Sequence, residues 1–175
     1  MKQSMQVLTS QLTDEWYTPP FYITLVEQVL TVIDLDPASS EKAQQWIQAR
    51  RYFTKEDNGL IQTWWGKVFL NPPYGKSEGK SNQAIWANRL LKFYEKGLVE
   101  EAILLINSAH GYKWYESLWT RYPVCCVRER IHFVAVDGSI DGQSKKAQTF
   151  VYFGRNITRF QKVFSSIGRV LLPEQ

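Results

Sequence analysis

The tetrapeptide Asn71-Pro72-Pro73-Tyr74 places hydrogen-bond acceptors and a flat ring directly after the apolar run 67–70. Proline fixes φ and has no backbone N–H, so this stretch is stiff, and its prolines offer carbonyl groups only. The Asn71 side chain adds a further carbonyl acceptor, and Tyr74 adds an aromatic face. A loop of this kind accepts hydrogen bonds from a planar NH2 group and stacks against the molecule that carries it.

The segments around this loop are predicted to alternate between helices and strands, because apolar residues occur either at helical spacing or in short runs. Helices are predicted at 21–33, after Ser39 or Ser40 as a capping residue, at 84–97, at 112–122 and at 157–168. Strands are predicted just before a turn at Asp36-Pro37 and at 51–54, 67–70, 101–108, 123–127, 131–136 and 149–154, with a mobile loop at 71–83. This order indicates an α/β fold with a largely parallel sheet and an antiparallel pair among the final strands.

In open sheets of this class, ligands bind beyond the carboxyl ends of the strands. Asn71 directly follows the predicted strand at 67–70, so the sequence places the loop at that edge.

The composition is that of a globular protein, with 44% hydrophobic and 22% charged residues in a chain of 175. We predict a flexible tail at 1–13 and a single domain at 14–175. No apolar run approaches the ~20 residues that a membrane span needs, and the amino terminus lacks the apolar core of a secretion signal. Cys125 and Cys126, the only cysteines, are adjacent, which disfavours a disulfide and leaves a zinc site incomplete. They indicate thiols in a strand of a reduced, intracellular protein.

Charge is unevenly distributed along the chain. Residues 1–49 contain two basic and six acidic residues, a net charge of −4, whereas residues 50–175 contain 19 basic and 11 acidic residues, a net charge of +8. A basic surface favours a polyanionic partner, and nucleic acid is the commonest one.

Six short motifs together resemble one known family. They are "DEWYTPP" (14–20), "IDLDPAS" (33–39), "YFTKEDNGL" (52–60), "VFLNPPYG" (68–75), "RIHF" (130–133) and "TFVYFG" (149–154). In this order they resemble the phage-type DNA N-6-adenine methyltransferases over residues 14–170. The resemblance implies a Rossmann-like class I methyltransferase fold with helices on both faces of the sheet. It also implies methyl transfer from S-adenosylmethionine to the N6 amino group of a DNA adenine that is rotated out of the duplex.

The resemblance assigns roles to residues by motif. The catalytic motif is Asn71, Pro72, Pro73 and Tyr74, and the expected cofactor-binding residues are Thr18, Pro19, Asp34, Asp36, Pro37, Ala38, Ser39 and Asp57. Carboxylates and small residues at strand ends suit an ammonium or a ribose diol, and by strand alternation Asp34 and Asp36 point the same way. The chain lacks the glycine-rich turn that many methyltransferases have after their first strand. "DPASS" either replaces that turn or corresponds to the later acidic ribose-binding segment.

DNA is the expected partner, with Lys76, Lys80 and Arg130 as expected phosphate contacts. No membrane association and no metal is expected, the location is expected to be cytoplasmic (the host cell's cytoplasm for a phage-encoded enzyme), and nothing in the sequence specifies an oligomeric state. The chain has no separate target-recognition domain, which predicts a short or relaxed recognition sequence. Two alternatives stay open: a protein glutamine N-methyltransferase, whose substrate amide is also a planar NH2 group, and a non-catalytic nucleic-acid-binding module on the same fold.

Overall fold

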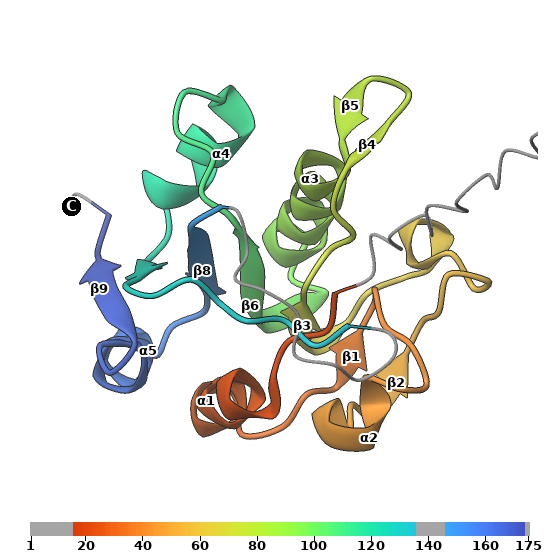
Figure 1. The fold of residues 1–175 in the computed structure, drawn as a ribbon, viewed down its shortest axis with the longest axis horizontal. Coiled ribbons are helices and arrows are strands. Elements are labelled where there is room, and N and C mark those ends of the chain that lie inside the picture. The colour runs from red at the N-terminus through yellow and green to blue at the C-terminus, as the bar shows by residue number, and fades with distance from the viewer. Residues whose placement is uncertain (1–15, 136–145, 174–175) are drawn as a thin grey trace, which may run out of the picture.

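The structure, a computed structural model, describes residues 16–135 and 146–173 (Figure 1). The predicted tail at 1–13 lies outside the described residues. The helices are α1 (Pro20–Leu30), α2 (Gln44–Ile47), α3 (Asn82–Glu95), α4 (Lys113–Trp119) and α5 (Ile157–Phe164), with a short 3-10 helix at Gly59–Ile61. The strands are β1 (Leu35–Asp36), β2 (Arg51–Tyr52), β3 (Gly66–Leu70), β4 (Lys76–Ser77), β5 (Lys80–Ser81), β6 (Val99–Asn107), β7 (Val124–Val127), β8 (Gln148–Phe153) and β9 (Gly168–Leu171).

Seven strands form one sheet in the order β2-β1-β3-β6-β8-β7-β9. The first four are parallel to one another. Strand β8 is antiparallel to both β6 and β7, and β9 is antiparallel to β7, so five of the seven strands run in one direction. The predicted α/β class, with a mostly parallel sheet and antiparallel strands near the carboxyl terminus, is confirmed.

Helices cover both faces of the sheet, as predicted. In Figure 1, α1, α2 and α5 lie on one side and α3 and α4 on the other. Strand β6 shows why the sequence requires both layers: Ile103 and Leu105 pack in one apolar cluster with α1 and α5, while Leu104 and Ile106 pack in the other with α3 and α4. A strand whose successive side chains are all apolar is stable only when both faces are covered.

Three segments differ from the sequence prediction. The predicted strand at 131–136 has, within its described residues, only a single bridge between Val134 and Tyr17. Ile131 and Phe133 are buried and His132 is exposed, so the segment has strand-like alternation without a neighbouring strand to pair with. Strand β9 was not predicted, because the edge segment Gly168–Leu171 has no long apolar run.

The third difference is in the predicted mobile loop at 71–83, which contains a β-hairpin. Strands β4 and β5 pair antiparallel across the two-residue turn Glu78-Gly79. Both turn residues have positive φ, 50° and 76°, as a type I′ hairpin turn requires. Ser81 then caps α3 by accepting a hydrogen bond from the Ala84 N–H, so the hairpin leads directly into this helix.

Candidate active site

Most of the sequence-predicted site residues lie at the carboxyl edge of the sheet. Strands β1, β3, β6 and β7 run in the same direction, so their carboxyl ends meet at this edge. The residues that end these strands are Asp36, Leu70, Asn107 and Val127. Asn71 therefore follows β3 at the edge, with the end of β1 on one side and the end of β6 on the other.

The side-chain amide of Asn71 is held in one orientation by residues from the start of the described chain. Its Nδ2 donates to the Trp16 carbonyl oxygen at 3.0 Å and to the Thr18 hydroxyl at 3.1 Å. Both amide hydrogens are thus used, and the Oδ1 atom is left as the acceptor. The hydroxyl of Tyr74 approaches this oxygen at 3.4 Å, which is too long for a strong bond.

Thr18 is itself fixed. It is only 1% exposed, and its backbone carbonyl accepts a hydrogen bond from the Trp46 indole at 2.9 Å. Pro19, the next residue, is the N-cap of α1 and is partly buried. The two sequence motifs at 17–20 and 71–74 therefore meet through the bond between Thr18 and Asn71.

Asn71, Pro72, Pro73 and Tyr74 form a corner at the sheet edge. The last three of these residues are also positioned by protein contacts. Pro72 is buried, Pro73 is exposed and Tyr74 is half-buried. The ring of Tyr74 lies edge-on to Phe133, with centroids 5.9 Å apart. The backbone carbonyl of Tyr74 accepts a hydrogen bond from the Asn82 side chain at 3.0 Å, which ties the loop to the start of α3. Burial raises the pKa of the Tyr74 phenol well above its usual range, so this group is neutral.

On the β1 side of the corner, Asp36 is a buried carboxylate. It accepts hydrogen bonds from the Ala38 N–H at 3.3 Å and from the Gln44 side chain at 3.1 Å. Burial raises the pKa of Asp36 to about 6, although the bonds from Ser39, Ala38 and Gln44 oppose the shift. Pro37 is buried, and Ala38 and Ser39 are half-buried. This turn is a compact polar site whose charge changes near neutral pH.

The loop after β2 packs against this turn. A Cβ on Gly59 would lie 2.0 Å from the Pro37 carbonyl oxygen, so only glycine allows the two backbones to approach this closely. Asp57 is exposed in the same loop, and its Oδ2 accepts from the Thr54 N–H and hydroxyl, both at 2.9 Å. These bonds lower the pKa of Asp57. Its bonds show that Asp57 stabilises its own loop, and its predicted contact with the cofactor stays a prediction.

Asp34 has different partners from Asp36. Its Oδ1 pairs with Arg50 at 2.9 Å, and its Oδ2 accepts from the Lys67 N–H at 2.9 Å. A Cβ on Gly66 would lie 2.7 Å from the same Oδ2 atom. Asp34, directly before β1, therefore bonds to Arg50 directly before β2 through one oxygen and to β3 through the other, at the end of these strands away from the carboxyl edge.

Sequence reasoning missed a group of buried amides on the β6 side of the corner. Gln83 is 5% exposed, and its Oε1 accepts from the Asn107 N–H at 3.3 Å. Its Nε2 is buried with no hydrogen-bond partner among the described residues. The Asn107 side chain accepts from Gln148 at 3.2 Å. The available signal was the ending of the apolar run 102–106 in Asn107 and Ser108.

The predicted DNA contacts are exposed. Lys76 and Lys80 lie on the β4–β5 hairpin, and Arg130 lies three residues after β7. In the described part of the chain, no group of three or more His, Cys, Asp or Glu residues is placed to hold a metal ion. Within residues 16–135 and 146–173, the structure contains no helix with the length and apolarity needed to cross a bilayer.

The mostly parallel seven-stranded sheet and the two helical layers are consistent with a Rossmann-like methyltransferase fold. A family model described as DNA N-6-adenine-methyltransferase (Dam) matches residues 6–174, nearly the whole chain. The protein belongs to this family. Comparisons with curated proteins and with solved structures gave no match.

Proposed function

We propose that this protein transfers a methyl group from S-adenosylmethionine to the N6 amino group of adenine in DNA. The supporting observation is the Asn71 amide, whose hydrogens are both bonded to Trp16 and Thr18 and whose oxygen is therefore presented as an acceptor. Membership of the Dam family supports the same assignment.

The corner would act on N6 through hydrogen bonding. The lone pair of an adenine amino nitrogen is delocalised into the ring, so the amine is a weak nucleophile. When Asn71 Oδ1 and the Pro72 carbonyl oxygen each accept a hydrogen bond from this amino group, the nitrogen becomes pyramidal and its lone pair becomes directional. The contribution of the protein is positioning and fixed dipoles, without a covalent intermediate.

The residues at the end of β1 fit the polar groups of S-adenosylmethionine. A buried carboxylate (Asp36) and a hydroxyl (Ser39) lie at the sheet edge, and Gly59 keeps the neighbouring loop close to them. These groups suit the cofactor's ammonium or ribose diol, and Asp57 and the segment Thr18-Pro19 lie around the same edge. When bound, S-adenosylmethionine supplies an electrophilic methyl group on a sulfonium centre. Asp34 is left out of this proposed set because it precedes β1, away from the carboxyl ends of the strands, and is already ion-paired with Arg50.

The target base would have to leave the duplex, because N6 lies inside the base pair. The Tyr74 ring, packed edge-on against Phe133, offers a fixed surface on which a flipped base can stack. Lys76 and Lys80 on the adjacent hairpin would contact phosphates near the opened pair.

The assignment is tested by following labelled methyl groups from S-adenosylmethionine into plasmid DNA or into the proteins of a cell extract. We expect label in DNA, recovered as N6-methyladenine after digestion to nucleosides and mass spectrometry. Label in protein glutamine would instead support the amide methyltransferase, and methylated cytosine would exclude adenine as the target. A folded protein that binds DNA but fails to bind the cofactor would support the non-catalytic module.

A further inference from the structure

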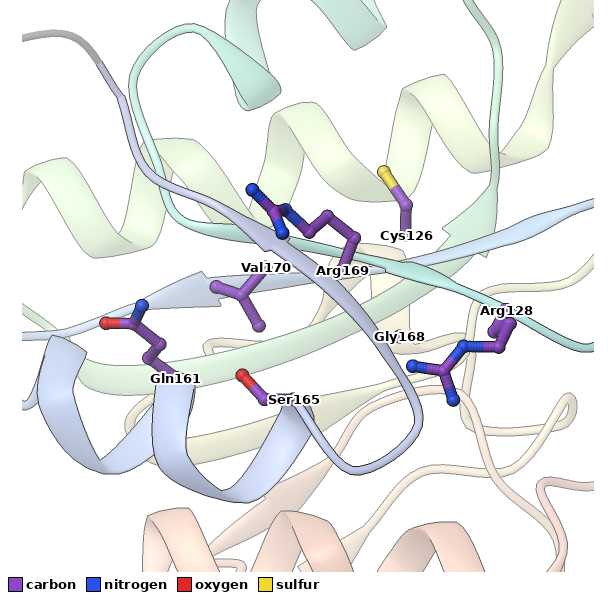
Figure 2. Close-up of a pocket in the computed structure, with 7 residues that line it drawn as sticks. All are labelled: Cys126, Arg128, Gln161, Ser165, Gly168, Arg169 and Val170. Atoms are coloured by element: carbon purple, nitrogen blue, oxygen red, sulfur yellow. The ribbon is translucent and has the colours of Figure 1, made fainter.

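A basic hollow lies away from the catalytic corner, between the end of β7, α5 and the start of β9 (Figure 2). Its volume is about 640 Å³. Arg128 and Arg169 supply its charge, and Gln161 and Ser165 on α5 supply neutral hydrogen-bonding groups. None of the residues given catalytic or cofactor-binding roles above lines this hollow.

The hollow and the corner lie at the same edge of the sheet. Strand β7 runs in the same direction as β3 and β6, and Val127 at its carboxyl end pairs with Gly168 at the start of β9. The strand order places β7 three strands from β3. At about 4.8 Å per strand, the two sites are separated by ~14 Å.

The two arginines of the hollow have no carboxylate partner in the part of the chain that the structure describes. Arg128 and Arg169 are exposed, and within residues 16–135 and 146–173 neither forms an ion pair with a carboxylate. Residues 155–172, which include α5 and β9, contain four basic residues and no acidic one. Glu129, next to Arg128 in the sequence, forms no ion pair with either arginine in the described residues, and its charge contributes, after burial, to raising the pKa of Tyr22 on α1.

The backbone around the hollow is closely packed. A Cβ on Gly168 would lie 2.2 Å from the Cys126 carbonyl oxygen and 2.7 Å from Cys125 Sγ, so glycine is needed for β9 to approach β7. The Arg128 N–H donates to the Ile167 carbonyl at 3.0 Å. The two arginines are therefore attached to a fixed strand pair, not to a loose loop.

A single chain segment connects the hollow to the corner. From Arg128 it crosses to Val134, which exchanges two backbone hydrogen bonds with Tyr17 at 2.9 and 3.0 Å (Figure 1). Along it, Ile131 and Phe133 are buried while Arg130 and His132 are exposed. The buried residues fix the segment on the protein, and the exposed ones form a polar line toward the residues that hold Asn71.

The guanidinium groups of Arg128 and Arg169 point in different directions (Figure 2). We propose that the hollow binds the DNA duplex on one flank of the target adenine, with Arg128 and Arg169 each contacting a different backbone phosphate. This inference rests on the proposed function and adds a second anchoring point to it. A separation of ~14 Å corresponds to about four base-pair steps of 3.4 Å. Binding the duplex at this point and at the corner would fix its direction across the sheet edge without reading its sequence.

The experiment compares the double variant Arg128→Gln/Arg169→Gln with wild-type protein in binding a fluorescent 20-base-pair duplex between 50 and 200 mM salt. Each lost phosphate contact lowers the slope of log K against log salt by about 0.9, so we expect a decrease of about 1.8. The same loss of counterion release predicts roughly 10- to 30-fold weaker binding near 0.15 M salt. Affinity for S-adenosylmethionine and kcat at saturating DNA should not change, whereas KM for DNA should rise.

The matched control is Lys96→Gln/Arg155→Gln, which removes the same charge at the opposite edge. Lys96 is exposed shortly before β6 begins, and Arg155 is exposed just after β8 ends. The salt slope of this control variant should equal that of the wild type. A duplex cut back to two base pairs on each side of the target should bind the wild type and the Arg128/Arg169 variant equally, because it no longer reaches the hollow.

An unchanged salt slope in the Arg128/Arg169 variant would overturn the proposal, and so would equal losses in both variants, which would indicate a general charge effect. Both results leave the proposed function intact if the wild type still methylates adenine. A wild-type protein that neither binds nor methylates DNA would overturn the proposed function together with this inference.

Discussion

The parallel half of the sheet, β2-β1-β3-β6, and the antiparallel half, β8-β7-β9, are held together by different interactions. Strands β1 and β2 have only two residues each, and side chains such as Asn71 and Asp34 add the bonds that fix the chain there. In the antiparallel half, β8 pairs with β6 over six residue pairs. Aromatic rings pack against it, including the stacked pair Tyr152 and Phe160 with centroids 5.0 Å apart.

This difference separates positioning from stability. Hydrogen bonds from side chains are directional, so those around Asn71 and Asp36 fix individual atoms at the sheet edge. Apolar and aromatic packing is less directional, and it supplies most of the free energy of folding. Substitutions that remove polar atoms in the parallel half should therefore alter activity, and those in the antiparallel half should alter stability.

Asn71→Ala should have the largest effect. It removes the acceptor that we assign to the N6 amine, and the loss of one such fixed dipole typically lowers kcat roughly 10²- to 10³-fold. Label transfer to DNA measures this, and circular dichroism checks the fold. Asn71→Asp is the matched control, since it keeps an acceptor oxygen and should lose less activity. An alanine variant with near-wild-type kcat would remove Asn71 from the mechanism.

Thr18→Val tests whether the orientation of the Asn71 amide matters. Valine keeps the shape of this buried residue and removes the hydroxyl that accepts from Asn71 at 3.1 Å. We expect kcat to fall roughly tenfold, because the amide can then rotate away from its productive orientation. Thr18→Ser should keep most of the activity.

A double variant makes the Thr18 test specific. In an Asn71→Ala background, Thr18→Val should cause no further loss, because both substitutions act through the same amide. Additive losses would show that Thr18 acts independently of Asn71.

The pH dependence of cofactor binding tests the β1 side of the corner. Burial raises the pKa of Asp36 from 3.8 to about 6. If the ionised carboxylate binds the cofactor, only about a tenth of the protein is competent at pH 5, so affinity for S-adenosylmethionine should fall roughly tenfold between pH 7.5 and pH 5. Isothermal titration calorimetry measures this, and Asp36→Asn should bind weakly with little change across the range.

For the protein without cofactor, the raised pKa of Asp36 predicts the opposite pH trend in the free energy of unfolding. The folded protein holds the Asp36 proton more tightly than the unfolded chain does. The stabilisation is therefore fully present below pH 3.8 and is lost as the pH rises through about 6. Denaturant unfolding should show this decline in the difference between the stability of the wild type and that of Asp36→Asn. A stability difference between wild type and Asp36→Asn that does not decline over this interval would contradict the buried position of Asp36.

Local patterns in the sequence predicted the parts of the fold that depend on neighbouring residues. Helical spacing identified α1 and α3, and apolar runs identified β3, β6 and β8. The prediction of a strand after Arg130 was wrong. Alternation of apolar and polar residues indicates only that every second residue is buried, and here that burial comes from packing on the sheet edge and not from pairing with a strand.

In the site too, only the features that depend on neighbouring residues were predictable from the sequence. The tetrapeptide at 71–74 was identifiable because its own residues define its chemistry. The bonds that orient it come from Trp16 and Thr18, 55 and 53 residues away, and no local pattern encodes such a pairing. Gln83 was missed because a glutamine at the start of an amphipathic helix has the composition of an exposed position, whereas the fold buries it against Asn107.

Tyr152→Phe should have the smallest effect on activity. The Tyr152 hydroxyl donates to Glu101 and accepts from the Asn156 N–H at 3.0 Å, so it links β8 to β6 and to the start of α5. Removing it should lower the free energy of unfolding by about 1–2 kcal/mol and leave kcat within about twofold of wild type, because no atom at the corner loses a partner. Denaturant unfolding and label transfer on the same preparation measure both quantities. A large drop in kcat with unchanged stability would show that the antiparallel half positions the corner as well as supporting it.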